Sequence, residues 1–430
     1  MKSYKTELDL NNEQASSCRR FAGAARWAYN YGIHRDIETH AKKEKRPTAF
    51  DLCKEIVILK DTPKEEGGCP WMREISKSVA EHAVKNLDFA YKMFFGRCKK
   101  KAERKGFPKL KSRRKGLGSF TLAGVIHVTE SAIQLPRLGV FRLKEHGYFP
   151  TNVRVKKATV SERAGRWFVS ILTDESVPVL TTGTEILGCD VGITTLATLS
   201  DGTTFENPKA LKKTQRKLKH LQRALARKKK GSSNRKKAVQ KLAQQHYKVT
   251  CVRKDAISKA TSAIAKRSLV LGIESLNVSG MMKNHCLAGA LGDASMSEFL
   301  RQLEYKMKWH GGTIKKADRF FPSSKRCSSC GYIMPELPLN VREWVCPQCG
   351  AYHFRDVNAA INLRDEAIRL IAVSSTVECA CGGDVRPVLA SPELAAPVKQ
   401  EPDSIAALVA EWVSSGERSP IDGSTPINSL

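Results

Sequence analysis

Hydrophobic positions along the first half of the chain predict a strand, a helical region and then several short strands. Residues 2–10 alternate between apolar and polar side chains, which is typical of a strand with one buried face. Apolar residues then recur at helical spacing and predict a small helical region from about residue 11 to 100. From 117 to 178 the pattern changes to short β segments, one of them a hairpin that turns at Ala164 and Gly165.

Buried strands and helices follow one another in the second half of the chain. The segment 185–202 predicts two apolar strands around a turn, and the segment 267–276 predicts a third. Between them, residues 209–254 predict an antiparallel helix pair whose apolar seam includes Leu218. After about residue 376 the sequence becomes rich in Pro, Ser and Glu and loses its basic bias, so we expect a mostly disordered tail.

Positive charge dominates the composition. The formal net charge is +30, from 73 Lys and Arg against 43 Asp and Glu. An excess of this size repels itself unless a polyanion is bound, so nucleic acid is the leading partner class and an anionic membrane is the alternative. Residues 209–254 contain eighteen Lys or Arg and no acidic residue, which favours a surface for a polyanion over an ordinary solvated face.

The apolar runs and the cysteine count bear on the compartment. The start, MKSYKTELDL, has no apolar core of signal-peptide length, and no uncharged apolar run is long enough to span a membrane. We therefore expect a cytoplasmic protein without a membrane partner, in which thiols stay reduced. The thirteen cysteines are an odd number and most are scattered, so a disulfide framework is not expected.

Two Cys-x-x-Cys pairs, fifteen residues apart, stand out among these cysteines. They are Cys327, Cys330, Cys346 and Cys349. This spacing is typical of four thiolates that hold one tetrahedral zinc ion, and Gly331 and Gly350 follow the pairs where tight turns favour glycine. Four protein ligands leave no open position for a catalytic water, so we predict one structural Zn²⁺. His353 is a further candidate ligand.

Three acidic residues lie where burial would make a lone charge costly. Asp190 lies within an apolar strand, Glu274 ends a second one, and Asp356 stands where the cysteine segment leads into the last helix. Asp356 could simply cap that helix and Glu274 could form an ion pair, whereas a mid-strand Asp190 has little structural use.

Together, the three carboxylates are what a ribonuclease H-like sheet needs. Carboxylates that converge at one edge of a sheet can hold two Mg²⁺ ions about 4 Å apart. One ion generates the attacking hydroxide and the other stabilises the leaving 3′ oxygen in an in-line displacement. Because clustered carboxylates repel one another, we expect the site to depend on metal and to weaken at low pH.

At these residues the chain resembles the TnpB family, transposon-encoded proteins long labelled OrfB transposases and related to the compact type V CRISPR nucleases. The resemblance covers residues 4–372 and rests on GCDVGITTLATLSDG, LGIESLNVSGMMKN, the two cysteine pairs and RDVNAAINL. It implies an RNA-guided DNA endonuclease of a bacterial or archaeal cytoplasm, associated with the nucleoid. A guide RNA from the end of the element would pair with one strand of double-stranded target DNA. A single RuvC site, with Asp190, Glu274 and Asp356 as catalytic and magnesium-binding residues, would cut both strands beside a short adjacent motif.

The same resemblance implies an α/β fold class with several domains: a ribonuclease H-like (RuvC) nuclease domain with an inserted four-cysteine zinc ribbon, a helical recognition domain and a β-rich wedge domain. The implied ranges are 1–10 and 101–182 for the wedge, 11–100 for recognition, 183–322 and 352–375 for the nuclease domain with 209–254 as its basic insert, 323–351 for the ribbon and 376–430 for the tail.

Contacts to nucleic acid follow from these assignments. The basic helices would contact the RNA scaffold, with Arg216, Lys219, Arg223 and Arg227 as candidates. Lys77 and Thr121 are candidates for recognising the target-adjacent motif, the alternative being that they contact only solvent or phosphate.

Several other functions compete with this interpretation. Single-strand transposases need a His-x-His pair, which the ten histidines do not contain, whereas a DDE transposase uses the same fold and metals. A catalytically weak or inactive RNA-guided DNA-binding regulator, or a transposase accessory protein, remains an alternative, although all three carboxylates are present. A general zinc-ribbon RNA-binding protein would leave Asp190 buried without a purpose. One departure from the family is Phe354, where many relatives have an aspartate.

Overall fold

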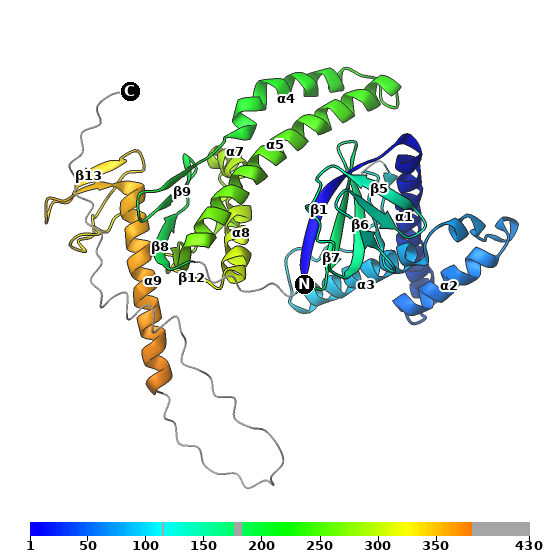
Figure 1. The fold of residues 1–430 in the computed structure, drawn as a ribbon, viewed down its shortest axis with the longest axis horizontal. Coiled ribbons are helices and arrows are strands. Elements are labelled where there is room, and N and C mark those ends of the chain that lie inside the picture. Colours follow the sequence, from blue (N-terminus) through cyan, green and yellow to red (C-terminus); the bar gives the residue numbers. More distant parts are fainter. Residues whose placement is uncertain (114–115, 176–182, 381–430) are drawn as a thin grey trace, which may run out of the picture. The chain divides into compact units, whose positions relative to one another are not determined.

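The computed structural model describes residues 1–113, 116–175 and 183–380 (Figure 1). The chain forms two compact units, residues 1–177 with 221–247, and residues 178–220 with 248–430. Apart from its first five residues, the tail that the sequence predicts lies outside the described residues. Among the helices that are described, none is long and apolar enough to cross a membrane.

The first unit contains a seven-stranded sheet with the order β2-β6-β7-β1-β5-β4-β3, in which all neighbours are antiparallel. Its strands are β1 (Lys2–Asp9), β2 (Ser119–Leu122), β3 (His127–Val128), β4 (Ala132–Leu135), β5 (Gly139–Leu143), β6 (Val155–Arg163) and β7 (Arg166–Thr173). The predicted hairpin is confirmed, because β6 and β7 are joined by Ala164 and Gly165 with φ of 57° and 81°. Two positive φ values are what a tight hairpin turn between twisted strands requires.

The helices of the first unit share an apolar core with this sheet, in which Phe21, Leu87 and Phe120 are buried. They are α1 (Asn12–Ala41), α2 (Ala49–Asp61) and α3 (Lys77–Lys99), with the short helical turns η1 (Lys64–Glu66) and η2 (Pro70–Glu74) between the last two. The start of α1 is fixed by a capping box, since the Asn11 side chain accepts from the backbone N–H of Gln14 and the Gln14 side chain accepts from that of Asn11. The helical pattern between residues 11 and 100 is thereby confirmed.

A five-stranded mixed sheet with the order β10-β9-β8-β11-β12 lies at the centre of the second unit. Its strands are β8 (Glu185–Asp190), β9 (Thr195–Leu199), β10 (Thr204–Glu206), β11 (Ser268–Ile273) and β12 (Thr313–Lys316). The first three form an antiparallel meander, and β11 and β12 continue the sheet parallel to β8. This arrangement is that of a ribonuclease H-like sheet, as the sequence predicts.

Helices cover both faces of this sheet (Figure 1). Two helices are shared between the units: α4 (Ala210–Ala226) up to residue 220 and α5 (Ser233–Arg267) from residue 248 belong to the second unit, and the rest of both to the first. The other helices of the second unit are α6 (Val278–Met281), α7 (His285–Ala294), α8 (Met296–Trp309) and α9 (Arg355–Ala380), and β13 (Glu343–Val345) pairs with β14 (Tyr352–Phe354) just before α9. Alternate strand residues face opposite sides: Leu187 and Ile273 pack with α5 and α8, whereas Ile186 and Val270 pack with α9.

Two glycines allow α9 to lie directly on the sheet. Gly188 of β8 and Gly272 of β11 are paired in register, and a Cβ atom at either position would overlap a backbone carbonyl oxygen of α9, that of Ala360 or Leu363. The second and third turns of α9 are therefore held against the central strands, which matters because the turn before them carries Asp356.

Replacing Gly188 by alanine is expected to lower the free energy of unfolding by about 3 kcal/mol or more, since a backbone overlap cannot be relieved by rotating a side chain. Thermal and denaturant unfolding would measure the loss. Gly289→Ala on α7 is the matched control, because a Cβ there meets no atom within 4 Å and alanine favours the helix. Equal stabilities of the two variants would contradict the close packing of α9.

Lys306 of α8 is a buried lysine without a carboxylate partner among the described residues. Its ammonium group donates to the carbonyl oxygen of Ser258 at 2.8 Å and to the hydroxyls of Thr261 and Ser262 at 2.7 and 2.9 Å. Burial lowers the pKa of Lys306 from 10.5 to about 8. The folded state thus binds this proton more weakly than the unfolded state, so the contribution of Lys306 to stability increases as the pH rises from about 8 to 10.5.

Comparing wild type with Lys306→Met by thermal unfolding at pH 7 and pH 9.5 isolates this effect. The stability of wild type relative to the variant is expected to rise by about 2 kcal/mol at the higher pH. A difference that is the same at both pH values would show that the lysine keeps an ordinary pKa in the fold.

Candidate functional site

The structure brings the three predicted carboxylates to one edge of the second sheet. Asp190 is the last residue of β8, and Glu274 directly follows β11, the parallel neighbour of β8. Asp190 shares a face with Gly188, as Glu274 does with Gly272, and this face is covered by α9. Asp356 lies in the first turn of α9. All three side chains are half-buried, so an ion from solvent can reach them.

The position of Asp190 corrects one expectation. The sequence predicts a mid-strand residue, whereas β8 ends at Asp190 itself. The chain leaves the sheet there, because the turn toward β9 begins at Val191 and Gly192. An apolar run that continues past a strand end hides the boundary from a sequence pattern. A position at the end of β8 favours a metal-binding role for Asp190, because the end of a strand is accessible to solvent whereas its centre is not.

Negative charge predominates around Asp190. Burial, together with the charges of Glu274 and Asp356, raises the pKa of Asp190 to about 7, although the backbone N–H of Val191 and the Arg355 guanidinium act in the opposite direction. No ion pair of Asp190 occurs among the described residues. A divalent cation would relieve this repulsion, so the donor set fits Mg²⁺, which prefers carboxylate oxygens.

The ribbon segment contacts two of the three carboxylates. The Ser323 hydroxyl donates to Oε1 of Glu274, and Arg342 forms an ion pair with Oδ1 of Asp356 at 3.2 Å. The two contacts link residues that are 49 and 14 positions apart, and the local sequence around them does not predict either contact. The ribbon therefore lies against the carboxylate site and orients part of it.

Two asparagines of α9 also bind the start of this segment. Nδ2 of Asn358 donates to the carbonyl oxygen of Arg326 at 2.8 Å, and its Oδ1 accepts from the backbone N–H of Ser328 at 2.9 Å. Nδ2 of Asn362 donates to the carbonyl oxygens of Ser323 and Arg326 at 2.8 and 2.6 Å. Both asparagines are buried and lie one helical turn apart. The N-x-x-x-N spacing within RDVNAAINL is the sequence signal for this contact.

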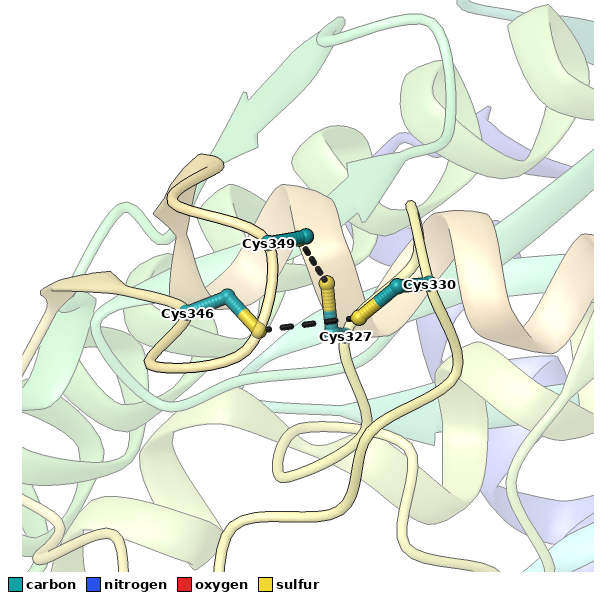
Figure 2. A group of neighbouring side chains, drawn as sticks. All are labelled: Cys327, Cys330, Cys346 and Cys349. Carbon is teal, nitrogen blue, oxygen red and sulfur yellow. Dashed lines mark hydrogen bonds between the residues drawn. The ribbon is translucent and has the colours of Figure 1, made fainter.

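The four predicted cysteines form a compact cluster (Figure 2). Their sulfur atoms all lie within 4.8 Å of one another, with 3.7 Å between Cys327 and Cys349 and 3.6 Å between Cys330 and Cys346. Sulfur atoms bound to a tetrahedral zinc at about 2.3 Å are separated by roughly 3.8 Å, so the cluster fits Zn²⁺. The part of the chain that the structure describes has no comparably compact group that includes the three carboxylates.

The two cysteine turns are built in the same way. The N–H of Cys327 donates to the carbonyl of Tyr332 and the N–H of Cys346 to that of Ala351. The N–H groups of Gly331 and Gly350 donate back to the carbonyls of Cys327 and Cys346. Both glycines have positive φ, 81° and 72°, which explains the glycines after each pair. Two equivalent turns are what a single ion with four thiolate ligands needs.

His353 lies beside the cluster as a neighbour of one of its ligands. It is buried, its Nε2 is 3.0 Å from Sγ of Cys327, and its ring packs on Trp344. Burial lowers the pKa of His353, so the ring is neutral at pH 7 and can donate a hydrogen bond to the thiolate. Phe354 projects from the other side of β14, where it is exposed and contacts the ring of Tyr352.

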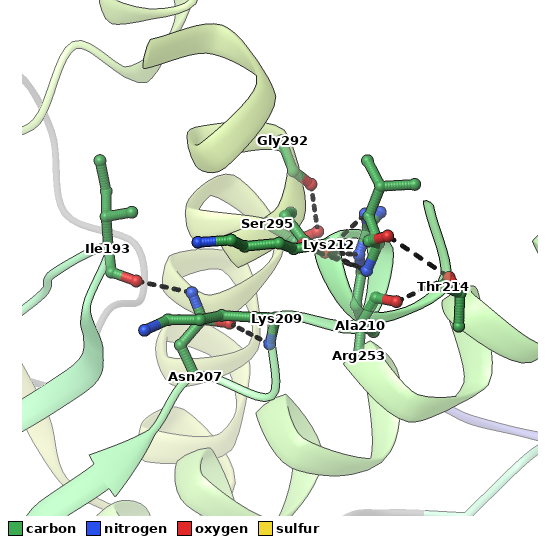
Figure 3. Close-up of polar contacts among 11 residues, drawn as sticks. Ile193, Asn207, Lys209, Ala210, Lys212, Thr214, Arg253, Gly292 and Ser295 are labelled. Carbon is green, nitrogen blue, oxygen red and sulfur yellow. Dashed lines mark hydrogen bonds and ion pairs between the residues drawn. The ribbon is translucent and has the colours of Figure 1, made fainter. Parts of the chain in front are cut away.

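A buried carboxylate from another helix holds the N-terminus of the basic helix α4 in place (Figure 3). The buried carboxylate of Asp293 accepts from the backbone N–H groups of Leu211 and Lys212 at 2.9 and 3.1 Å and pairs with Arg253 at 2.8 Å. A carboxylate at a helix N-terminus satisfies free N–H groups and complements the helix dipole. Asp293 is 82 residues from Leu211 in sequence, and no pattern around it indicates this role.

The candidate RNA-binding residues of this segment are exposed. Arg216, Lys219 and Arg223 lie on α4 and Arg227 directly follows it, while Leu218 is buried as the predicted seam requires. None of the four basic residues forms an ion pair with a described residue, so their charges are available to an anion.

The structure does not bring the two candidates for motif recognition into one cavity. Lys77, the first residue of α3, is exposed beside an apolar cavity of about 780 Å³ between α2 and α3. Thr121 of β2 lines a separate cavity of about 440 Å³, and its hydroxyl hydrogen-bonds to that of Thr159 at 3.0 Å.

The fold and the site define a class: a ribonuclease H-like domain with three carboxylates at one sheet edge and a four-cysteine ribbon inserted before the third. Family models also match parts of this chain. Residues 158–285 match the OrfB family of IS605 elements, described as "Probable transposase", residues 297–363 match a Cas12f1-like TNB domain, and residues 1–45 match a helix-turn-helix domain of the OrfB proteins.

Curated relatives match over nearly the whole chain. A "Putative RNA-guided DNA endonuclease" of Streptomyces pristinaespiralis is 35% identical over 410 residues, which are 93% of this chain and 96% of the relative. InsQ of Escherichia coli K12, named in the same way, is 31% identical over 395 residues, 88% of this chain and 95% of the relative. A solved Cas12f1-sgRNA-target DNA complex aligns with 85% of this chain and 98% of its own at 15% identity, with a TM-score of 0.32. The chain belongs to the OrfB/TnpB family of IS605-type elements.

Proposed function

We propose that this protein is an RNA-guided DNA endonuclease that cuts target DNA next to a short adjacent motif. The observation that carries the proposal is the convergence of Asp190, Glu274 and Asp356 at one edge of the sheet, where burial and like charge raise the pKa of Asp190. The relatives' printed names supply the substrate and the guide. All three carboxylates would be catalytic metal ligands.

When bound, two Mg²⁺ ions would activate the attacking water and stabilise the leaving oxygen. The residues of this chain prepare the site for them. Ser323 fixes the orientation of Glu274 by donating to Oε1, and the close packing at Gly188 and Gly272 fixes the second and third turns of α9 and so the preceding turn, which carries Asp356. Arg342 holds Asp356 at 3.2 Å and is itself exposed, so it can also contact a phosphate of the substrate.

The guide RNA is expected to bind the basic face of α4. Replacing Arg216, Lys219, Arg223 and Arg227 together by glutamine should weaken RNA binding. The steepness with which the logarithm of the association constant falls with the logarithm of the salt concentration should decrease by about 3, since each lost phosphate contact removes about 0.7. Filter binding or fluorescence anisotropy over a salt series measures this slope.

A control variant loses four other exposed lysines that form no ion pair among the described residues: Lys42, Lys43, Lys45 and Lys64. Its net charge changes by the same amount, so it reports the effect of charge alone. Equal slopes for the two variants would show that α4 has no special role in binding RNA.

The deciding experiment is plasmid cleavage by the purified protein–RNA complex. The RNA carries the element's own 3′ end as scaffold, the plasmid carries a randomised sequence beside the target, and Mg²⁺ is added or withheld. Guided, Mg²⁺-dependent cutting at a subset of the library supports the proposal and identifies the motif. Tight guided binding without any cutting would instead support a DNA-binding regulator, with Phe354 as the first residue to restore to aspartate.

A further inference from the structure

The loop between β12 and the ribbon presents an aromatic ring to solvent beside the carboxylates. Phe320 is 84% exposed, the largest exposed fraction of any large apolar side chain among the described residues. We propose that Phe320, together with Arg319, is a stacking platform for an unpaired base of single-stranded DNA next to the scissile phosphate. This inference rests on the proposed function and adds to it a residue that positions the substrate strand.

Both ends of the loop are tied to the strand end that carries Glu274. At its start, the N–H of Ala317 donates to the carbonyl of Ile273 at 2.9 Å, and the Ser275 hydroxyl donates to the carbonyl of Ala317 at 2.7 Å. At its end, the Ser323 hydroxyl donates to Glu274. Phe320 is three residues from each tie, so its Cα lies within about 11 Å of both. The ring is therefore a near neighbour of the carboxylate edge.

Internal hydrogen bonds hold the loop in one conformation. The N–H of Phe320 donates to Oδ1 of Asp318 at 3.0 Å, and that of Phe321 to the carbonyl of Asp318 at 3.2 Å. The N–H of Ser323 then donates to the carbonyl of Phe321 at 2.8 Å, and Phe321 itself is half-buried. Phe320 is thus presented on a fixed turn, and a pre-positioned ring loses little freedom when a base stacks on it.

The chemistry of the pair matches a single strand of nucleic acid. The Arg319 guanidinium lies 5.6 Å from the centre of the Phe320 ring, so the exposed surface combines an aromatic face with a positive charge. Bases stack on aromatic side chains irrespective of sequence, while a cation pairs with the adjacent phosphate. A nuclease guided by base pairing needs contacts of this sequence-independent kind at its cutting site.

Replacing Phe320 by alanine is expected to slow guided cleavage about tenfold under single-turnover conditions. Guided DNA binding, measured in an Asp190→Ala background, and the Mg²⁺ dependence should stay unchanged. Phe320→Trp keeps a stacking face and should retain the wild-type rate. Phe50→Ala removes another exposed phenylalanine, 66% accessible and in the first unit, and serves as the matched control.

A second readout reports stacking directly. A fluorescent adenine analogue, 2-aminopurine, replaces in turn each nucleotide that flanks the cut. Its fluorescence should be quenched in the wild-type complex. Among the variants, only Phe320→Ala should lose this quenching. Wild-type rate and quenching in Phe320→Ala would overturn the platform. If wild type does not cut at all, the proposed function fails. The platform is then judged by quenching of 2-aminopurine in plain single-stranded DNA, and equal quenching by wild type and Phe320→Ala would overturn it.

Discussion

Replacing Asp190 by alanine is expected to reduce guided cleavage by at least about a thousandfold, equivalent to about 4 kcal/mol of transition-state stabilisation. Burial, together with the charges of Glu274 and Asp356, raises the pKa of Asp190 to about 7, so Asp190 is the one of the three proposed metal ligands on which both other carboxylates act. Its removal also relieves repulsion in the metal-free protein. The Asp190→Ala protein should therefore be more stable to unfolding but less active than wild type, which is the usual trade-off at a site whose residues destabilise the fold.

Single-turnover cleavage and thermal unfolding without Mg²⁺ measure the two effects. Asp365→Ala is the control, because Asp365 is an exposed aspartate of α9 paired only with the neighbouring Arg364 in the described structure. It should cleave like wild type. An Asp190→Ala protein that cleaves within tenfold of wild type would place the catalytic carboxylates elsewhere.

Removing the zinc ligand Cys327 is expected to unfold the ribbon and abolish cleavage with it. The apolar core of the ribbon has only four buried residues, Cys327, Leu337, Trp344 and Cys346, two of which are themselves ligands. A core this small does not hold a fold without its metal, and a structural zinc typically contributes about 10 kcal/mol or more. Ser323 and Arg342, which contact Glu274 and Asp356, would lose their positions.

Metal content and hydrogen exchange test this prediction. Wild type should carry one zinc per chain, and Cys327→Ser should lose the zinc and expose the backbone of residues 323–351 to fast exchange. Cys286→Ser, which changes an exposed cysteine outside the cluster, should have neither effect. A zinc-free Cys327→Ser protein that keeps its exchange protection and cuts at the wild-type rate would show that the ribbon folds without the ion.

The sequence was sufficient to predict which residues gather at the site, because two simple periodicities decide it. Asp190 ends β8 and Glu274 directly follows its parallel neighbour β11, with both side chains on the same face, and Asp356 lies in the first turn of the helix that covers that face. The cysteine spacing and the glycines after each pair likewise predict the cluster that is observed. Strand ends were less predictable, since the apolar run around Asp190 continues past the last residue of β8.

Contacts between distant side chains could not be predicted in this way. Asp293 caps α4, and Ser323 and Arg342 contact the carboxylates, only because the whole unit has folded around them. Serine, arginine and aspartate are common surface residues, and their local sequence does not indicate which residue elsewhere in the chain they will contact. Phe320 illustrates the same limit, because its exposure depends on how the loop is tied at both ends.

Gly188 and Gly272 have a consequence for saturation mutagenesis of this protein. Neither glycine has a side chain that could touch a nucleic acid, yet any substitution would push α9 away from the sheet and shift Asp356. In a screen scored by guided cutting, substitutions at both glycine positions should abolish activity as often as substitutions at Asp190. Scoring protein abundance alongside cutting would separate them, because the glycine variants would be depleted from the cell whereas Asp190 variants would accumulate normally.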